Sequence, residues 1–303
     1  MTDIEKLKKE LIEQKQSKFP GNIYHVSQVL FAYNSNKIEG SRLTEEQTEM
    51  IFETNSFFPD KDDEVVRVDD ITETVNHFKL FDFILDHIDD RLNKDMIIEM
   101  NKILKKGTSD ESNPRYNVGG FKIHPNVIGL VNVIKTSKPD EVERDIDVLI
   151  EEYNRLGKVT LEDIVDFHLR FERIHPFGDG NGRVGRAIMF KECLKNNIVP
   201  FIILDRDKPY YLRGLKEYDR DRTYLLETCL NEQDIYTDLC KQLLNLDFNI
   251  TVDNEQDEDM ELWLSYVKKR QTASFLHTVL FYKEGANKYE ACVFNRGTWW
   301  KIH

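Results

Sequence analysis

The chain has 303 residues, and its 42 lysines and arginines against 55 aspartates and glutamates give a formal net charge of −13. A hydrophobic content of 40% beside 32% charged residues excludes general disorder, and the acidic total disfavours nucleic acid as a partner. No apolar run approaches the roughly 20 residues of a membrane span, and residues 1–14 lack the apolar core of a signal peptide, so we expect a cytoplasmic protein without a membrane partner.

Apolar residues recur at helical spacing up to about residue 245, which predicts a mainly α-helical chain. One example is the series Ile71, Val75 and Phe78 behind Asp70, a candidate helix cap. The same spacing predicts further helices at residues 2–17, 24–35, 45–54, 94–105, 139–156, 161–173, 183–196, 208–218 and 232–245.

Residues 24–40 are predicted to form a separate short helix. Gly40 is a candidate helix stop, and Thr44 with Gln47 has the form of a capping box for the next helix. Ser35 and Glu39 lie four residues apart, so we expect both on one face of this helix.

One stretch interrupts the helical pattern. Residues 117–134 are rich in glycine and β-branched residues, with His124-Pro125-Asn126 as the predicted turn of a β-hairpin. Two interpretations stay open. The hairpin closes one edge of the core, or its exposed strand edge holds the extended peptide of a partner protein.

The composition divides the chain into three parts. We predict N-terminal helices over residues 1–110, a core over 111–250 and an appendage of unknown order over 251–303. The last part opens with an acidic run, residues 253–261, which is typical of a solvated linker.

The segment that points to chemistry is 175–186, with the sequence HPFGDGNGRVGR between two predicted helices. Three glycines at alternate positions free the backbone to adopt positive φ, so that successive N–H groups can converge on one anion. A helix that begins near Gly182 or Arg183 adds its positive end, and Arg183 and Arg186 lie on one face of it. A triphosphate suits such a loop.

Two further residues of this segment carry chemistry. Asp179 would repel phosphates without a cation between them, and a hard oxygen ligand suits Mg²⁺. His175 can act as a general base near neutral pH. Taken singly, His175 also fits a helix C-terminal histidine bonded to a carbonyl, and the two arginines fit surface ion pairs.

Together the residues match the pattern HxFx(D/E)GNGRxxR without a gap, and on this motif the chain resembles the Fic family. Every specified position is filled, by His175, Phe177, Asp179, Gly180, Asn181, Gly182, Arg183 and Arg186. The resemblance extends over about residues 20–245. It implies a helical core with a β-hairpin flap, here residues 117–134, on which a target protein docks.

The resemblance implies transfer of AMP from ATP to a Tyr, Thr or Ser hydroxyl of a protein, with release of pyrophosphate. His175 would take the hydroxyl proton, and Asp179 would bind Mg²⁺ at the α- and β-phosphates. Tyr210 or Tyr211 would line the adenine pocket, although an aromatic residue at either position also fits the core.

The phosphates are assigned to the loop and the following helix. The backbone amides of Gly180 to Gly182 would bind them, and the Asn181 side chain would fix the α-phosphate. Arg183 would hold the β-phosphate and Arg186 the γ-phosphate.

A second match lies upstream, where the residues SNKIEG at positions 35–40 resemble the (S/T)xxxE(G/N) inhibitory motif of some Fic proteins. In such a protein Glu39 would pair with Arg186 and place negative charge where the γ-phosphate must bind. The alternative is a solvated carboxylate at a helix end.

We therefore expect a protein adenylyltransferase inhibited by its own N-terminal helix. Two alternatives stay open: removal of AMP, in which Glu39 aligns a water molecule, and a non-catalytic nucleotide sensor. His175 argues against the sensor, because a sensor needs the arginines but no base. Self-modification and a homo-oligomer also stay open.

Overall fold

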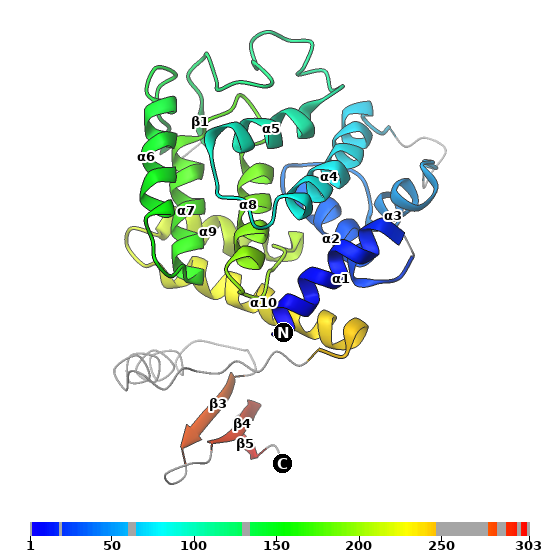
Figure 1. Ribbon diagram of the computed structural model, residues 1–303, viewed down its shortest axis with the longest axis vertical. Helices are drawn as coiled ribbons and strands as arrows, with labels where there is room; N and C mark the ends of the chain where they lie inside the picture. The colour runs from blue at the N-terminus through cyan, green and yellow to red at the C-terminus, as the bar shows by residue number, and fades with distance from the viewer. Residues whose placement is uncertain are drawn as a thin grey trace. The chain divides into compact units, whose positions relative to one another are not determined.

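The structure is a computed structural model, drawn in Figure 1. It describes residues 2–17, 20–59, 65–128 and 134–246, together with three strands between residues 278 and 301. The chain divides into two compact units, Met1–Phe248 and Asn249–His303. The predicted division at residue 110 falls within the first of these units, and the one predicted near residue 250 lies close to the division between them.

The first unit is mainly helical, which confirms the helical part of the predicted fold class. Its helices, with one 3₁₀ turn, are α1 (Asp3–Ser17), α2 (Ile23–Ile38), α3 (Glu45–Thr54), α4 (Val68–Asp86), α5 (Lys94–Lys105), α6 (Val142–Asn154), α7 (Leu161–Ile174), α8 (Asn181–Lys195), η1 (Asp205–Asp207), α9 (Lys208–Glu217) and α10 (Thr223–Leu244). Most begin and end within a few residues of the prediction. The exception is α10, which starts nine residues before the predicted position 232.

Helix α8 is the centre of this unit. It is buried at 13 of its 15 positions, and the buried residues include the charged Arg183, Arg186, Lys191 and Glu192. Helices α2, α4, α5 and α7 all contact it, and Figure 1 shows it between α7 and α4. Phe31 of α2 and Phe81 of α4 pack on Phe190 of α8, with ring centroids 5.5 and 5.2 Å away.

Helix α2 is not a separate element at the periphery. Twelve of its 16 residues are buried, and the Ser27 hydroxyl lies 2.7 Å from that of Tyr236 in α10. The predicted signals around it are confirmed. Gly40 follows the helix with φ +95°, and Thr44 and Gln47 form the capping box of α3. A helix packed in this way cannot leave its site without disrupting the core.

The predicted hairpin is found only in part. Strands β1 (Val127–Ile128) and β2 (Ile134–Lys135) pair antiparallel, and the residues that would join them lie outside the described ones, so the hairpin stays a prediction. The turn predicted at His124-Pro125-Asn126 is wrong, because both strands follow it. The reason is tertiary: the Lys122 amide just before it donates to the carbonyl of Pro176, 2.8 Å away.

In the second unit, β3 (Thr278–Lys283), β4 (Tyr289–Asn295) and β5 (Thr298–Lys301) form an antiparallel sheet in that order. In its register Val293 pairs with Val279 on one side and with Trp300 on the other. Within residues 2–17, 20–59, 65–128 and 134–246, no helix has the length and apolar character needed to cross a bilayer.

Candidate active site

The loop between α7 and α8 is shaped by its own residues. Helix α7 ends at His175, whose φ of 52° turns the chain, and the buried Phe177 ring anchors the next turn. The Asn181 side chain accepts a hydrogen bond from the Phe177 amide at 2.8 Å and donates to its carbonyl at 3.0 Å. These bonds hold the loop as a tight bend, while the predicted contact of Asn181 with the α-phosphate stays a prediction.

The loop glycines serve two purposes, and only one was predicted. Gly180 has φ +85° and precedes the first turn of α8, whose leading amides have no acceptor within the helix. Gly178 and Gly182 do not have positive φ, contrary to prediction. They are required for close approach instead. A Cβ at position 178 would lie 2.8 Å from the Tyr116 carbonyl, and one at 182 would collide with a carboxylate oxygen of Glu39.

His175 is held by a hydrogen bond to the last turn of its own helix. Its Nδ1 lies 3.3 Å from the carbonyl oxygen of Glu172, which can only accept, so Nδ1 carries the proton and Nε2 the free electron pair of the neutral ring. Burial lowers the pKa of His175 below its ordinary value, and the nearby ammonium of Lys122 lowers it further. The ring is therefore neutral at pH 7.

Arg186 is occupied by the end of α2. It donates to the Ser35 hydroxyl and carbonyl, both at 3.0 Å, and its Nη2 lies 2.7 Å from Glu39 Oε1. The guanidinium side chain is 2% exposed and the carboxylate side chain 37%. Burial alone would raise the pKa of Glu39, but Arg186 and then Arg183 lower it below its ordinary value, so Glu39 is ionised at pH 7.

Arg183 is occupied as fully, by Asp179 and by two residues that the sequence did not single out. Its Nη1 donates to Glu73 Oε2 at 2.6 Å and to Asn36 Oδ1 at 3.3 Å, and its Nη2 donates to Asp179 Oδ2 at 2.9 Å. Glu73 is on α4 and Asn36 on α2. Nothing in the sequence near Glu73 distinguishes it from an ordinary exposed helical carboxylate.

Asp179 has a side chain 45% exposed and belongs to a cluster of charges. The Lys105 ammonium lies among the carboxylates of Glu73, Asp110 and Asp179, and its Nζ is 2.6 Å from both aspartates. Burial would raise the pKa of Asp179, but Arg183 and Lys105 lower it to about 2. An ionised, partly exposed carboxylate beside a phosphate-binding loop suits a hard cation such as Mg²⁺.

Two further residues near His175 were missed. The Lys122 ammonium, 3% exposed, donates to Asn126 Oδ1 at 2.6 Å, Thr136 Oγ1 at 2.9 Å and the Ile174 carbonyl at 3.1 Å. The Glu172 side chain is 13% exposed, with a carboxylate oxygen 3.9 Å from Nδ1 of His175, and burial raises its pKa to about 8. A lysine and a glutamate that the fold buries carry no local signal in the sequence.

The two tyrosines predicted at the adenine pocket lie in different surroundings. Tyr211 is 1% exposed, and its hydroxyl is 2.7 Å from Nε2 of His168, which agrees with the core alternative. Its ring is also near the Arg186 guanidinium, 5.9 Å from centroid to Cζ. Tyr210 is 62% exposed. The structure therefore does not bring the two together in one pocket.

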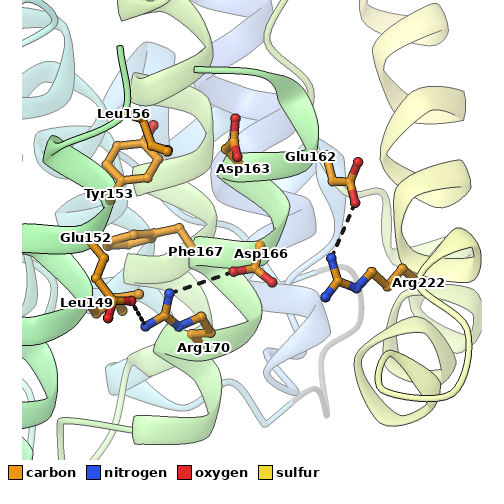
Figure 2. A pocket seen from close by; sticks show the side chains of 10 residues that line it. All are labelled: Leu149, Glu152, Tyr153, Leu156, Glu162, Asp163, Asp166, Phe167, Arg170 and Arg222. Atoms are coloured by element: carbon orange, nitrogen blue, oxygen red, sulfur yellow. Dashed lines mark hydrogen bonds and ion pairs between the residues drawn. The ribbon is translucent and has the colours of Figure 1, made fainter. Parts of the chain in front are cut away.

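A pocket elsewhere on the first unit contains none of these residues. Figure 2 shows it between α6, α7 and the start of α10. Two of its carboxylates are paired closely with arginines: Glu152 lies 2.5 Å from Arg170, and Glu162 lies 3.5 Å from Arg222. We assign it no role.

Comparison with known proteins places this site in a family. The model of the Fic/DOC family matches residues 91–193, which include the whole 175–186 loop. A probable protein adenylyltransferase of Aquifex aeolicus is 38% identical over 61 residues, 20% of this chain and 18% of that protein. Protein adenylyltransferase fic-1 of Caenorhabditis elegans is 24% identical over 190 residues, 61% of this chain. The chain spans 35% of that protein's length.

Solved structures agree on the fold. A Fic domain-containing signalling protein of Bacteroides thetaiotaomicron has a TM-score of 0.58 at 23% identity, over 80% of this chain and 92% of that one. A Fic family protein of Desulfovibrio desulfuricans has a TM-score of 0.60 at 22% identity, over 80% and 75%. The family match, the complete loop motif and the shared fold agree, and we conclude that the chain contains a Fic/DOC family domain.

Proposed function

We propose that the protein is an adenylyltransferase that transfers AMP from ATP to a Tyr, Thr or Ser hydroxyl of a target protein. The observation that carries this proposal is a loop that places a neutral His175 beside the amide end of α8, with Arg183 and Arg186 on that helix. A base, an anion-binding helix end and two guanidinium groups are the parts that such a transfer needs.

In the proposed reaction, His175 Nε2 takes the proton of the target hydroxyl. The hydroxyl oxygen then bonds to the α-phosphorus of ATP, and the bond from that phosphorus to the bridging oxygen breaks to release pyrophosphate. Arg183 and Arg186 stabilise the charge that develops on the β- and γ-phosphates. Asp179 is the residue that would hold Mg²⁺, which supplies charge neutralisation when bound.

The inhibitory contact follows from the pairing of Glu39 with Arg186. Their 2.7 Å contact withholds the guanidinium from the γ-phosphate and leaves a carboxylate close to where that phosphate must bind. Because α2 is packed into the core, release of Arg186 requires the Glu39 side chain to turn away at the end of the helix. Removal of the whole helix is not required.

The target protein is proposed to dock along β1 and β2. Val127 in β1 is 54% exposed, and Asn126 just before it donates to the carbonyl of Phe177 in the catalytic loop, 3.0 Å away. A peptide that extends this strand pair would therefore lie near His175. Self-modification at this edge, a homo-oligomer and a cytoplasmic location remain parts of the proposal.

The test is intact-mass spectrometry of the Glu39→Gly variant with ATP and Mg²⁺. We expect AMP to be added to the protein itself or to a lysate protein far faster than with wild type. The reason is that the substitution frees Arg186 and removes a carboxylate that repels the γ-phosphate, and charges this close interact by several kcal/mol. The other nucleoside triphosphates serve as controls. An enzyme that only removes AMP would lose its activity in this variant. The absence of any adduct with every nucleotide would refute the transferase assignment.

A further inference from the structure

The two arginines of α8 are neutralised by different carboxylates. Arg186 pairs with Glu39 at the end of α2, whereas Arg183 pairs with Glu73 in the first half of α4. Both guanidinium groups are nearly inaccessible, with side chains 2% and 3% exposed. The contact of Glu39 with Arg186 therefore does not explain why Arg183 is also neutralised.

Glu73 uses both of its carboxylate oxygens. Oε2 accepts from Arg183 Nη1 at 2.6 Å, and Oε1 pairs with the Lys105 ammonium. Lys105 keeps Asp110 and Asp179 as partners without Glu73, and Arg183 keeps Asn36 and Asp179. Loss of the Glu73 charge would therefore leave neither cation alone.

We propose that Glu73 is a second inhibitory carboxylate, which competes with the β-phosphate of the nucleotide for Arg183. This inference rests on the proposed function, because that function assigns the β-phosphate to Arg183. Inhibition then has two independent contacts from two N-terminal helices. Removal of Glu39 frees only the arginine assigned to the γ-phosphate.

The charges in the site support competition. At the two arginines, three carboxylates (Glu39, Glu73 and Asp179) face two guanidinium groups (Arg183 and Arg186), so an incoming polyphosphate meets no net positive charge there. Without Glu39 the count at the arginines is two carboxylates against two guanidinium groups, and only the further loss of Glu73 leaves a cationic excess. Like charges placed side by side at an interface cost several kcal/mol.

The opposite role for Glu73 makes a different prediction. Among the described residues, Arg183 Nε has no hydrogen-bond partner, and in the opposite role a phosphate oxygen accepts from it while Glu73 orients the guanidinium. If Glu73 orients Arg183, its removal weakens nucleotide binding. If Glu73 competes, its removal strengthens binding.

The experiment compares calorimetric affinities for AMP, ADP and ATP in the full-length Glu73→Gln protein and in wild type. We expect the affinity for ADP and ATP to increase roughly tenfold or more, and the affinity for AMP, which lacks a β-phosphate, to stay unchanged.

Asp110→Asn is the matched control. It removes a carboxylate from Lys105 without touching Arg183, so ADP affinity should stay at the wild-type value. Thermal melts verify that each variant is folded, and Glu73→Ala repeats the measurement if the glutamine variant is not.

Unchanged or weaker ADP binding by a folded Glu73 variant overturns this inference, as does equal tightening by Asp110→Asn. Such a result together with AMP transfer by Glu39→Gly would leave the proposed function intact. If no variant binds any nucleotide or transfers AMP, both proposals fall.

Discussion

The two sides of the catalytic loop are built in different ways. On the phosphate side, Arg183 is held by an ion pair with Glu73, which lies 110 positions earlier in the sequence. Arg186 is held by an ion pair with Glu39, which lies 147 positions earlier. On the His175 side, contacts are mainly hydrogen bonds to uncharged acceptors, such as those from the Lys122 ammonium to the Ile174 carbonyl and from the Asn126 side chain to the Phe177 carbonyl. In the proposed function, the charged side is rearranged before the nucleotide phosphates bind, whereas the proposed base is already in place. On this proposal, regulation and chemistry are separated within one loop.

The largest expected effect is the loss of AMP transfer when His175 is replaced. Substitution His175→Ala in a Glu39→Gly background should lower AMP transfer by about 10²–10⁴-fold, because a positioned base contributes that much. Nucleotide affinity should stay nearly unchanged, since the imidazole is separate from the arginines. Radiolabel transfer and calorimetry measure the two quantities, and retention of transfer would remove His175 from the role of base.

The next effect concerns the coupling of Glu39 and Arg186. Arg186→Ala should weaken transfer and also abolish inhibition, because one guanidinium serves both the γ-phosphate and Glu39. A double-mutant cycle on the transfer rate should then show non-additivity of about 1–3 kcal/mol. A Glu39→Gly substitution that activates equally in both backgrounds would contradict the shared-arginine interpretation.

The same contrast explains what the sequence could reveal. The 175–186 loop was predictable because its glycines, its base and its arginines lie within one short segment. The Glu39 contact was predictable only through a resemblance of its own local motif. Glu73 and Lys105 were not, because their role arises where α4, α5 and α8 meet. Their partners in the loop lie 110 and 74 residues away, respectively.

Local signals also misplaced parts of the fold. Pro125 next to Asn126 is typical of a turn, yet this segment is fixed by tertiary contacts of Lys122 and Asn126 with the catalytic loop. The start of α10 was missed because the residue before it forms no side-chain cap. In the first case a contact distant in the sequence determined the local structure. In the second the helix began without a side-chain cap that the sequence could have shown.

Glu172, which lies between the two sides, should make stability depend on pH. Burial raises its pKa in the folded protein to about 8, so its stabilising contribution is complete below its ordinary pKa of 4.5 and is lost as the pH rises towards 8. In Glu172→Gln this loss should disappear, which we expect to stabilise the protein at pH 8 by on the order of 2 kcal/mol.

Urea unfolding followed by circular dichroism at pH 5 and pH 8 measures this difference. Glu232, whose pKa burial also raises to about 8, contributes the same trend in both proteins and therefore cancels in the comparison. An equal decline in the free energy of unfolding for wild type and variant would show that Glu172 is ionised in the folded state.

The smallest expected effect concerns the influence of the Lys122 ammonium on the pKa of His175. Burial is the main cause of the lowered pKa of His175, and the Lys122 ammonium adds to it. Because His175 must be neutral to act as a base, transfer should fall as the pH drops through this lowered pKa, below 6.5. In a Glu39→Gly background, Lys122→Gln should move this acid limb to higher pH, since one positive charge that lowers the pKa of His175 is lost. Lys122→Arg keeps the charge and should leave the acid limb of the pH profile in place.

Lys122 itself, whose pKa burial lowers to about 8, loses its proton only where His175 is already neutral, so the effect is confined to the acid side of the profile. A limb that does not move with glutamine, or that moves equally with arginine, would mean that Lys122 fixes the flap segment to the loop without influencing the proton affinity of the base.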